Sequence, residues 1–287
     1  MNIVIYGSDG FVGRYIVRNL YNKVNLILPA RNIKKIQKVF KDLALINYVQ
    51  INEDNIQEPI YKFNPDMVIN LIGILTETSN QTFEKVHFEI TKNLVDANKA
   101  VGVKKFVQMS ALGADVNSKS RYLKTKAMAE EYVIKSGLNY VIFRPSIIIG
   151  REQKLFEDFR FYSKIIPIFM APYDARVQPV SVLDVADCFE KAVISDVKNS
   201  IFELCGNEVI DYVVLFKFAL NFIGVKRAIM PVPKRTFKLL LPIFSLMPKP
   251  IMTLDQYYML EKDNVCCGRY KGVRDLLGFV RDWSKDF

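Results

Sequence analysis

Three glycines near the start of the chain have the spacing of a phosphate-binding turn. Gly7, Gly10 and Gly13 follow an apolar run at residues 3–6 and lead into a helical pattern of apolar residues. In such a turn the first glycine permits the tight bend, the second lets the backbone approach the phosphates, and the third lets the helix pack closely on the strand. The free N–H groups of the helix then face the anion. The spacing therefore predicts a dinucleotide site, and the alternative is a glycine-rich turn without a ligand.

A cation stands where dinucleotide-binding folds that prefer NAD carry an acid. Those folds place Asp or Glu about 20 residues past the glycines, on the ribose hydroxyls. Here the second apolar run ends at 28–31, which has no carboxylate and finishes with Arg31. Arginine pairs with the 2′-phosphate of NADP, which a carboxylate would repel. We therefore expect NADP(H) as the preferred cofactor, NAD(H) as the alternative, and Arg14 as an assisting cation. The competing interpretation of Arg31 is an exposed arginine that begins a helix.

A tyrosine, a lysine and a serine could carry proton transfer beside a nicotinamide. Tyr122 and Lys126 are four residues apart in a predicted helix, so they share one face. An ammonium near a phenol lowers the pKa of the phenol, which makes Tyr122 a usable proton donor to a carbonyl that receives hydride. Ser110 follows the predicted strand at 104–109, and its hydroxyl could hydrogen-bond the substrate oxygen. These three are the candidate catalytic residues.

Strands and helices must alternate along the first half of the chain to position these side chains. We expect strands at 3–6, 24–28, 46–51, 67–73, 104–109 and 140–143, and helices that include 32–43, 81–101 and 121–136. This alternation predicts an α/β fold of the Rossmann type, with a doubly wound parallel sheet and the ligand at the carboxyl ends of its strands. The runs at 178–182 and 201–204 are expected to rejoin that sheet.

A smaller, mostly helical C-terminal lobe is expected beside the nucleotide-binding domain. We assign 1–145 to the Rossmann domain, with its sheet completed by about 179–205, and 146–178 together with 206–287 to the lobe. Within the lobe, the segment 234–252 is strongly apolar, flanked by cations, broken by prolines and too short to span a membrane. Such a segment can lie at an anionic membrane surface. The alternative is a helix buried within the lobe.

The charge and the few metal-binding side chains exclude several classes of protein. The net charge of +10 suits an anionic nucleotide or lipid, and no nucleic-acid-binding motif accompanies it. The four cysteines lack C-x-x-C spacing, and His87 is the single histidine, so we expect no metal site. We expect His87 to face the sheet or a neighbouring helix. Thiols suit a reducing compartment and no targeting segment is evident, which predicts a cytoplasmic protein, with a peripheral position on the inner membrane as the alternative.

Several segments together carry a resemblance to a known family. The chain resembles the extended and atypical short-chain dehydrogenase/reductases and, more closely, the nucleotide-binding accessory subunits of respiratory complex I (NADH:ubiquinone oxidoreductase) and their bacterial relatives. The segments that follow this pattern are 7–13, 70–73, 110–114, 120–127, 144–152, 178–185, 252–256 and 275–278. The resemblance covers essentially the whole chain.

The resemblance implies contacts for each part of the nucleotide. It implies the pyrophosphate and 2′-phosphate on the glycine turn and Arg31, the ribose along 71–73, the nicotinamide ribose at Tyr122 and Lys126, and the nicotinamide under 145–147. Asn52, Glu53 and Asp54 are the candidates for the contact to adenine, of which we take Asn52 and Asp54. The full set of expected cofactor residues is Gly7, Ser8, Gly10, Phe11, Val12, Gly13, Arg14, Arg31, Asn52, Asp54, Leu71, Ile72, Gly73, Ser110, Tyr122, Lys126, Pro145, Ser146 and Ile147.

Two functions are compatible with these residues. In the first, the protein holds NADP(H) as a structural or regulatory ligand and associates with respiratory complex I or another membrane complex. In the second, it is an NADP-dependent reductase, dehydratase or epimerase on a lipid-like or quinone-like substrate, and it uses Tyr122 and Lys126. The gap from Ser110 to Tyr122 is shorter than in typical catalytic members of the family, which speaks against Ser110 as a third catalytic residue.

Overall fold

A parallel sheet forms the centre of the fold in the computed structural model, which describes residues 1–245 and 251–286. Its strands lie in the order β14-β11-β6-β5-β4-β1-β2-β3, and every pairing in it is parallel. The strands are β1 (Asn2–Tyr6), β2 (Asn25–Ala30), β3 (Asn47–Gln50), β4 (Met67–Asn70), β5 (Lys105–Met109), β6 (Asn139–Pro145), β11 (Ser200–Leu204) and β14 (Lys271–Gly272). This is the expected α/β architecture.

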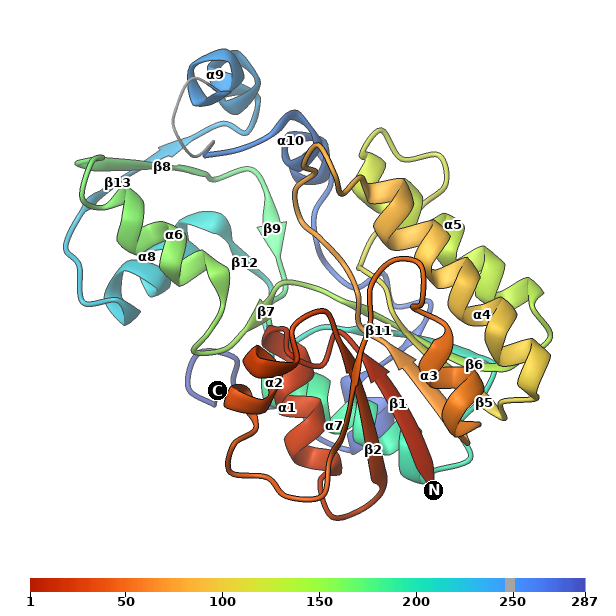
Figure 1. The fold of residues 1–287 in the computed structure, drawn as a ribbon. Helices are drawn as coiled ribbons and strands as arrows, with labels where there is room; N and C mark the ends of the chain where they lie inside the picture. The colour runs from red at the N-terminus through yellow and green to blue at the C-terminus, as the bar shows by residue number, and fades with distance from the viewer. Residues whose placement is uncertain (246–250, 287) are drawn as a thin grey trace.

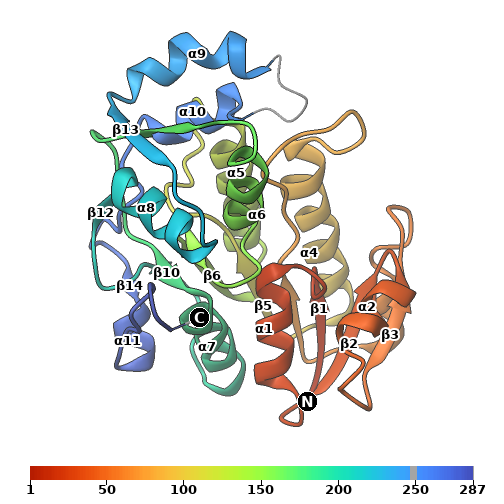
Figure 2. The ribbon, with the colours of Figure 1, turned by 90° about the vertical axis from the view of Figure 1, so that its left-hand side faces the viewer.

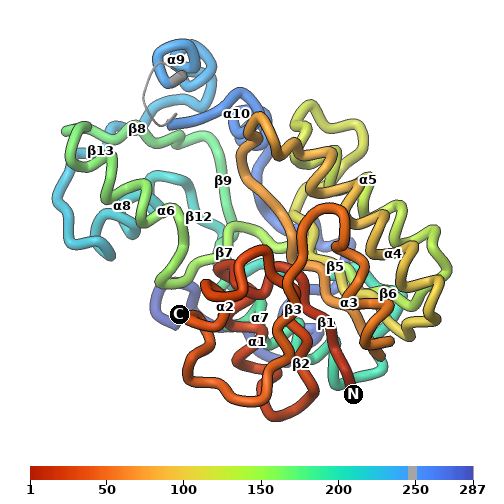
Figure 3. The backbone as a smooth tube through the Cα atoms, viewed as in Figure 1, coloured from red at the N-terminus to blue at the C-terminus, as the bar shows by residue number. Residues whose placement is uncertain are grey.

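Helices cover both faces of the sheet because its strands are apolar on both sides. Ile3 and Ile5 of β1 face one core, and Val4 and Tyr6 face the other, as the alternation of side chains along a strand requires. The first face carries α1 (Phe11–Leu20), α2 (Ile33–Val39), α7 (Val182–Ile194) and α11 (Val273–Leu277). The second carries α3 (Glu58–Phe63), α4 (Ile90–Val101) and α5 (Arg121–Lys135), with the π-helix η1 (Glu84–Glu89) leading into α4. The fold is therefore doubly wound, as predicted (Figures 1 and 3).

The strand order reverses direction between β1 and β4. From β1 the chain proceeds outward through β2 and β3, and from β4 it proceeds the other way through β5 and β6. Connections on either side of such a point leave a crevice outside the carboxyl ends of the strands, where ligands of open α/β sheets bind. The glycine turn and the segment 71–75 lie at this point.

The C-terminal lobe is built on a two-stranded ribbon with helices on both of its faces (Figure 2). In the ribbon, β8 (Ile168–Pro172) pairs in parallel with β13 (Ala228–Val232). Phe169 and Ile229 pack against α6 (Lys154–Tyr162) and α8 (Tyr212–Phe222), whereas Met170 and Val232 pack against α9 (Arg235–Ser245) and α10 (Leu254–Leu260). A second pair joins β9 (Arg176–Val177) to β12 (Ile210–Asp211). The lobe is thus less purely helical than the apolar pattern after Tyr212 predicts.

Two expectations about long-range pairing are wrong. The run 178–182 does not rejoin the main sheet, because β10 (Val180–Ser181) pairs with β7 (Ile148–Ile149), and β11 takes the place beside β6. The sequence also predicts thiols, whereas Cys205, which follows β11, and Cys266 form a disulfide between positions 61 residues apart. Sequence spacing reports on local structure, and both pairings are set by tertiary packing. Within the described ranges, no helix has both the length and the apolar content to cross a bilayer.

Candidate functional site

The glycine turn has the backbone geometry of an anion cradle. Gly7 has a φ of +76°, which side-chain-bearing residues rarely adopt, and its carbonyl accepts a hydrogen bond from the Gly10 N–H at 3.1 Å. A Cβ on Gly13 would lie 2.4 Å from the Gly7 carbonyl oxygen, so only glycine fits there. Gly10 offers no side chain to cap α1, and no acid stands in the first turn of that helix. The first N–H groups of α1 are therefore open to an anion.

Two adjoining cavities extend from this turn along the carboxyl ends of the strands. The smaller has a volume of about 230 Å³ and the larger about 420 Å³. Both are lined by Gly7, Gly10, Leu71, Gly73 and Ile74, so the turn and the segment after β4 lie between them. An elongated ligand with its two phosphates at the turn would place one end in each cavity.

Most of the expected cofactor residues line these cavities. Arg31, Asn52 and Ile72 line the smaller one. The larger is lined by Phe11, Val12, Gly13, Ser110, Tyr122, Lys126, Pro145, Ser146 and Ile147. Residues at or just after the carboxyl ends of β1, β4, β5 and β6 therefore meet residues of α5 at one crevice, although they are far apart in the sequence.

Three of the expected residues do not line either cavity. The Arg14 Nε donates a hydrogen bond to the Asp9 carbonyl at 3.0 Å, so the guanidinium stabilises the backbone of the turn and does not line a cavity. Asp54 lies outside both cavity walls, because the side-chain Oδ1 of Asn52 accepts the Asp54 N–H at 2.8 Å and so forms a turn that directs Asp54 away. Ser8 is fully buried beneath the turn, and its hydroxyl has no hydrogen-bond partner among the described residues. Glu53, the adenine candidate that we did not choose from the sequence, does line the smaller cavity and forms an ion pair with Lys85.

The electrostatic expectation for Tyr122 is wrong in sign. Burial and the Asp255 carboxylate raise the pKa of Tyr122 to about 12. Burial also lowers the pKa of Lys126 to about 8, and its ammonium donates to the Met109 carbonyl at 3.2 Å. Desolvation of both groups therefore outweighs the favourable effect of a cation on a phenolate. Ser110 is buried in the same wall, and its hydroxyl also has no partner in the described part of the chain.

His87 lies inside the protein, as expected, and supports the wall of the larger cavity. Its ring stacks on Phe83 and meets the edge of Tyr122 at a centroid distance of 5.1 Å. Its Nδ1 is 3.0 Å from the Thr125 hydroxyl, and its Nε2 accepts the Ile74 N–H at 3.1 Å. Burial and the nearby Lys126 charge lower the pKa of His87 to about 2, which keeps the ring neutral. The π-helix η1 carries His87 to this position, and such helices occur often at functional sites.

Sequence reasoning missed contributions from the C-terminal lobe to the same cavity. Met259 of α10 and Asn264 line it, and the Ser146 hydroxyl donates to Asn264 Oδ1 at 2.5 Å. Glu152 lines it as well and accepts a hydrogen bond from the Tyr15 hydroxyl at 2.7 Å. The motif at 252–256 was the one available signal of this contribution, because it precedes both Met259 and Asn264.

These features fit a dinucleotide. The cradle excludes side chains, the first N–H groups of a helix face it, and the buried Ser110 hydroxyl in the wall of the larger cavity has no hydrogen-bond partner among the described residues. A metal site has no comparable support, since the described residues hold no cluster of three or more histidine, cysteine or acidic side chains suited to an ion.

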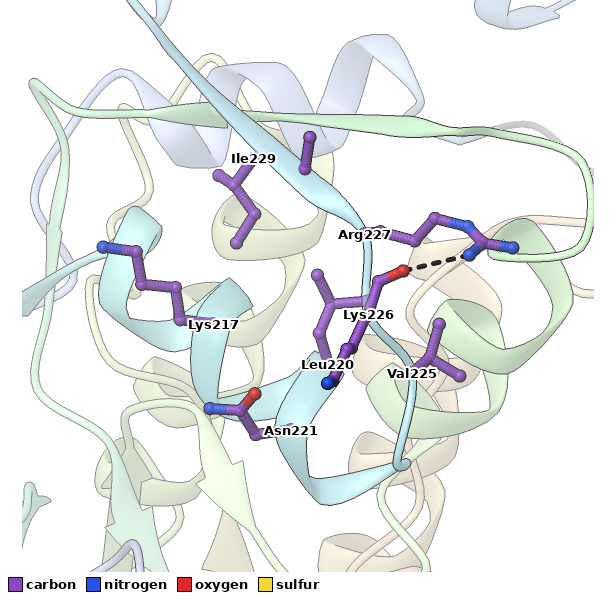
Figure 4. A pocket seen from close by; sticks show the side chains of 8 residues that line it. Lys217, Leu220, Asn221, Val225, Lys226, Arg227 and Ile229 are labelled. Atoms are coloured by element: carbon purple, nitrogen blue, oxygen red, sulfur yellow. Dashed lines mark hydrogen bonds between the residues drawn. The ribbon is translucent and has the colours of Figure 1, made fainter.

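A separate hollow of about 520 Å³ lies on the C-terminal lobe, between the end of α8 and the start of β13 (Figure 4). Its lining includes three cations, Lys217, Lys226 and Arg227, and apolar side chains such as Leu220. The Arg227 guanidinium donates to the Ser163 and Lys226 carbonyls. None of the expected cofactor residues lines this hollow.

The fold and the crevice define an NAD(P)-binding protein with a Rossmann-type domain. Residues 7–158 match the family model described as NAD(P)H-binding, and the chain belongs to this family. The fold is also that of a solved structure, the NADPH-dependent quinone oxidoreductase of Escherichia coli complexed with NADPH. The TM-score is 0.74, the sequences are 17% identical, and the match covers 98% of this chain and 97% of that one.

Within this class the chain is homologous to accessory subunits of mitochondrial complex I. It is 28% identical over 283 residues to NADH dehydrogenase (ubiquinone) 1 alpha subcomplex subunit 9 of Mus musculus, which covers 95% of this chain and 74% of the mouse protein. It is 29% identical over 283 residues to the NADH-ubiquinone oxidoreductase 40 kDa subunit of Neurospora crassa, with the same two coverages. The homology spans both the nucleotide-binding domain and the C-terminal lobe.

Proposed function

We propose that this chain binds NADP(H) in preference to NAD(H) at the crevice. The observation that carries the proposal is the position of Arg31, which lines the smaller cavity at the end of β2, where an acid would select NAD. The Gln50 side-chain amide donates a hydrogen bond to the Arg31 carbonyl at 2.7 Å, which fixes the backbone at Arg31. The two acids of the cavity wall, Asp9 and Glu53, are each paired with a lysine, which reduces their repulsion of a 2′-phosphate.

The remaining residues take the roles that their places in the crevice support. The glycine turn binds the pyrophosphate, and the segment 71–73 lies along the ribose. Tyr122 and Lys126 bind the nicotinamide ribose, and the segment 145–147 covers the nicotinamide. When bound, the nicotinamide supplies or accepts hydride. The contributions of the chain are to bind it, to orient it and to exclude water from one of its faces.

We further propose that the nucleotide is a structural or regulatory ligand and that the protein associates with a respiratory or other membrane assembly. Two homologues are by name subunits of such an assembly. The raised pKa of Tyr122 supports a binding role, because a phenol with a pKa of about 12 is a poor proton donor at neutral pH. We place the protein at the periphery of the inner membrane, since the Cys205–Cys266 disulfide removes two of the thiols on which the expectation of a cytoplasmic protein rested.

The segment 234–252 supplies the membrane contact in this proposal. Its described part includes α9, which buries Phe237 and Phe244 and exposes Leu239 and Ile243 to 78% and 58%. Exposed cations at the start of the helix, Lys238 among them, suit an anionic surface. The remaining apolar residues at 246–250 lie outside the described residues.

The test of the binding role is to purify the protein without added nucleotide and to identify what it retains. We expect NADP(H) to remain bound and to exchange slowly, because the cradle is preformed and the ligand is enclosed at both ends. A site that exchanges freely and retains nothing through purification favours the second function.

A specific observation favours that second function, an NADP-dependent oxidoreductase. Ser110, Tyr122 and Lys126 line one cavity together with apolar residues that include Leu112 and Met259, so a lipid-like or quinone-like carbonyl compound fits beside the nicotinamide. In that case Tyr122→Phe abolishes oxidation of NADPH by such a substrate and leaves NADPH binding intact. Wild-type protein that binds NADPH but turns over no quinone leaves the binding role as the better explanation.

A further inference from the structure

The first turn of α5 is closed by a carboxylate from a distant part of the chain. Asp255, on α10, accepts hydrogen bonds from the Ser120 hydroxyl at 2.8 Å, the Arg121 N–H at 2.5 Å and the Tyr122 N–H at 3.4 Å. The Ser120 hydroxyl in turn accepts the Leu123 N–H at 3.2 Å. The open N–H groups of the first turn therefore receive their partners from one serine of the helix and one aspartate of the lobe.

This contact supplies a charge that α5 lacks. The first turn of α5 contains no acid of its own, although a negative charge near a helix N-terminus is stabilising. Tyr122 is the second residue of the helix, and Lys126 follows one turn later, so both candidate ligands of the nicotinamide ribose depend on where this end of the helix is held.

Asp255 does not cap its own helix, because a different pair of side chains does so. At the start of α10, the Thr253 hydroxyl accepts the Gln256 N–H at 3.2 Å, and the Gln256 side chain accepts the Thr253 N–H at 2.9 Å. One turn beyond Asp255, Met259 lines the larger cavity and packs against the apolar cluster that contains Tyr122. In Figures 1 and 2, α10 lies beside the N-terminal end of α5. Helix α10 thus contacts the N-terminal end of α5 through Asp255 and forms part of the wall of the larger cavity through Met259.

We propose that Asp255 is a positioning residue that joins the C-terminal lobe to the nicotinamide half of the nucleotide site. The inference rests on the proposed binding of NADP(H). Asp255 contacts the start of α5 and lines neither cavity, so it acts on the ligand through Tyr122 and Lys126. The adenine half, held by the glycine turn and Arg31, is independent of it.

The test compares two probes on the full-length protein. NADPH occupies both halves of the site, and adenosine 2′,5′-bisphosphate occupies the adenine half alone. For Asp255→Ala we expect the NADPH affinity to fall roughly three- to thirtyfold, the range of a lost helix cap, and the affinity for the bisphosphate to stay within about twofold of wild type. The matched control is Asp211→Ala, which removes the carboxylate that accepts the Val214 N–H at the start of α8. It should leave the ratio of the two affinities unchanged.

The ratio of the two losses decides the result. A NADPH loss below about threefold, or one no greater than the loss for the bisphosphate, overturns the proposal, and so does an equal effect of Asp211→Ala. If Asp255→Ala does not fold, Asp255→Asn, which keeps the shape and removes the charge, is judged by the same ratio. Wild-type protein that binds neither probe overturns the proposed function itself.

Discussion

Replacing two glycines of the same turn with alanine should have different effects: Gly10→Ala should weaken nucleotide binding, and Gly13→Ala should destabilise the fold. Gly10 has φ −72° and ψ 172°, a conformation open to any residue, and an added Cβ would meet only the Gly7 carbonyl oxygen at 3.2 Å. The Cβ of Gly13→Ala would lie 2.4 Å from that oxygen and 2.8 Å from the backbone of Ser8. The methyl group of Gly10→Ala therefore makes one close contact and otherwise extends into the space where we expect the pyrophosphate, whereas that of Gly13→Ala fills space that the backbone already occupies.

The magnitudes follow from these contacts. Gly10→Ala removes a favourable N-cap residue, which lowers stability, but it also makes the unfolded chain less flexible, which raises stability. Because the two effects oppose each other, the free energy of unfolding should change by less than about 1 kcal/mol. Its methyl group holds the phosphates away from the N–H groups of α1, which should weaken NADPH binding at least tenfold, or about 1.4 kcal/mol. Gly13→Ala should lower the free energy of unfolding by about 1–3 kcal/mol through overpacking.

The assay is thermal unfolding of the nucleotide-free proteins together with calorimetric titration of NADPH. A protein of this size loses roughly 2–4 °C in Tm per kcal/mol, so Gly13→Ala should melt several degrees below wild type and Gly10→Ala close to it. The reasoning is refuted if Gly10→Ala binds NADPH as tightly as wild type, or if the Tm of Gly13→Ala equals that of wild type.

Three further predictions concern the cofactor, its pH dependence and the membrane. Arg31→Ala should weaken NADPH binding about ten- to a hundredfold and leave NADH binding unchanged, and equal wild-type affinities for the two nucleotides contradict it. Lys126, with a pKa of about 8, carries its positive charge below that pH and loses it above. Binding of anionic NADPH should therefore weaken as the pH rises through 8 and lose this dependence in Lys126→Met, whereas a flat wild-type profile speaks against Lys126 as a ligand. The protein should float with anionic vesicles at low salt, less at high salt and less after Leu239→Ser with Ile243→Ser, and its absence from the lipid fraction in every condition leaves no role for α9 at a membrane.

The parts of the fold that local pattern determines were predictable from the sequence. The apolar run before Gly7 and the helical pattern after it specify β1 and α1, because strand and helix periods depend on neighbouring residues. The repetition of that unit predicts the parallel sheet, and the glycine spacing marks the switch point between β1 and β4. Arg31, Tyr122 and Lys126 could be placed near one crevice because each follows or faces the carboxyl end of a strand.

The remaining features depend on contacts between distant segments. The pKa of Tyr122 could not be predicted from the i, i+4 lysine, because the dominant cause is burial of the phenol by the assembled wall. Asp54 and Glu53 are neighbours in the sequence, and only the turn formed by Asn52 decides which of them faces the cavity. The contact of Asp255 with α5 joins residues more than a hundred positions apart, so no local pattern reveals it.

The central claim, that the crevice is an NADP(H) site, is tested most directly by calorimetric titration of nucleotide-free wild-type protein with NADPH and with NADH. We expect saturable binding of one NADPH per chain and binding of NADH weaker by about tenfold or more, because the Arg31 guanidinium pairs with the 2′-phosphate. The claim is contradicted if neither nucleotide gives saturable binding.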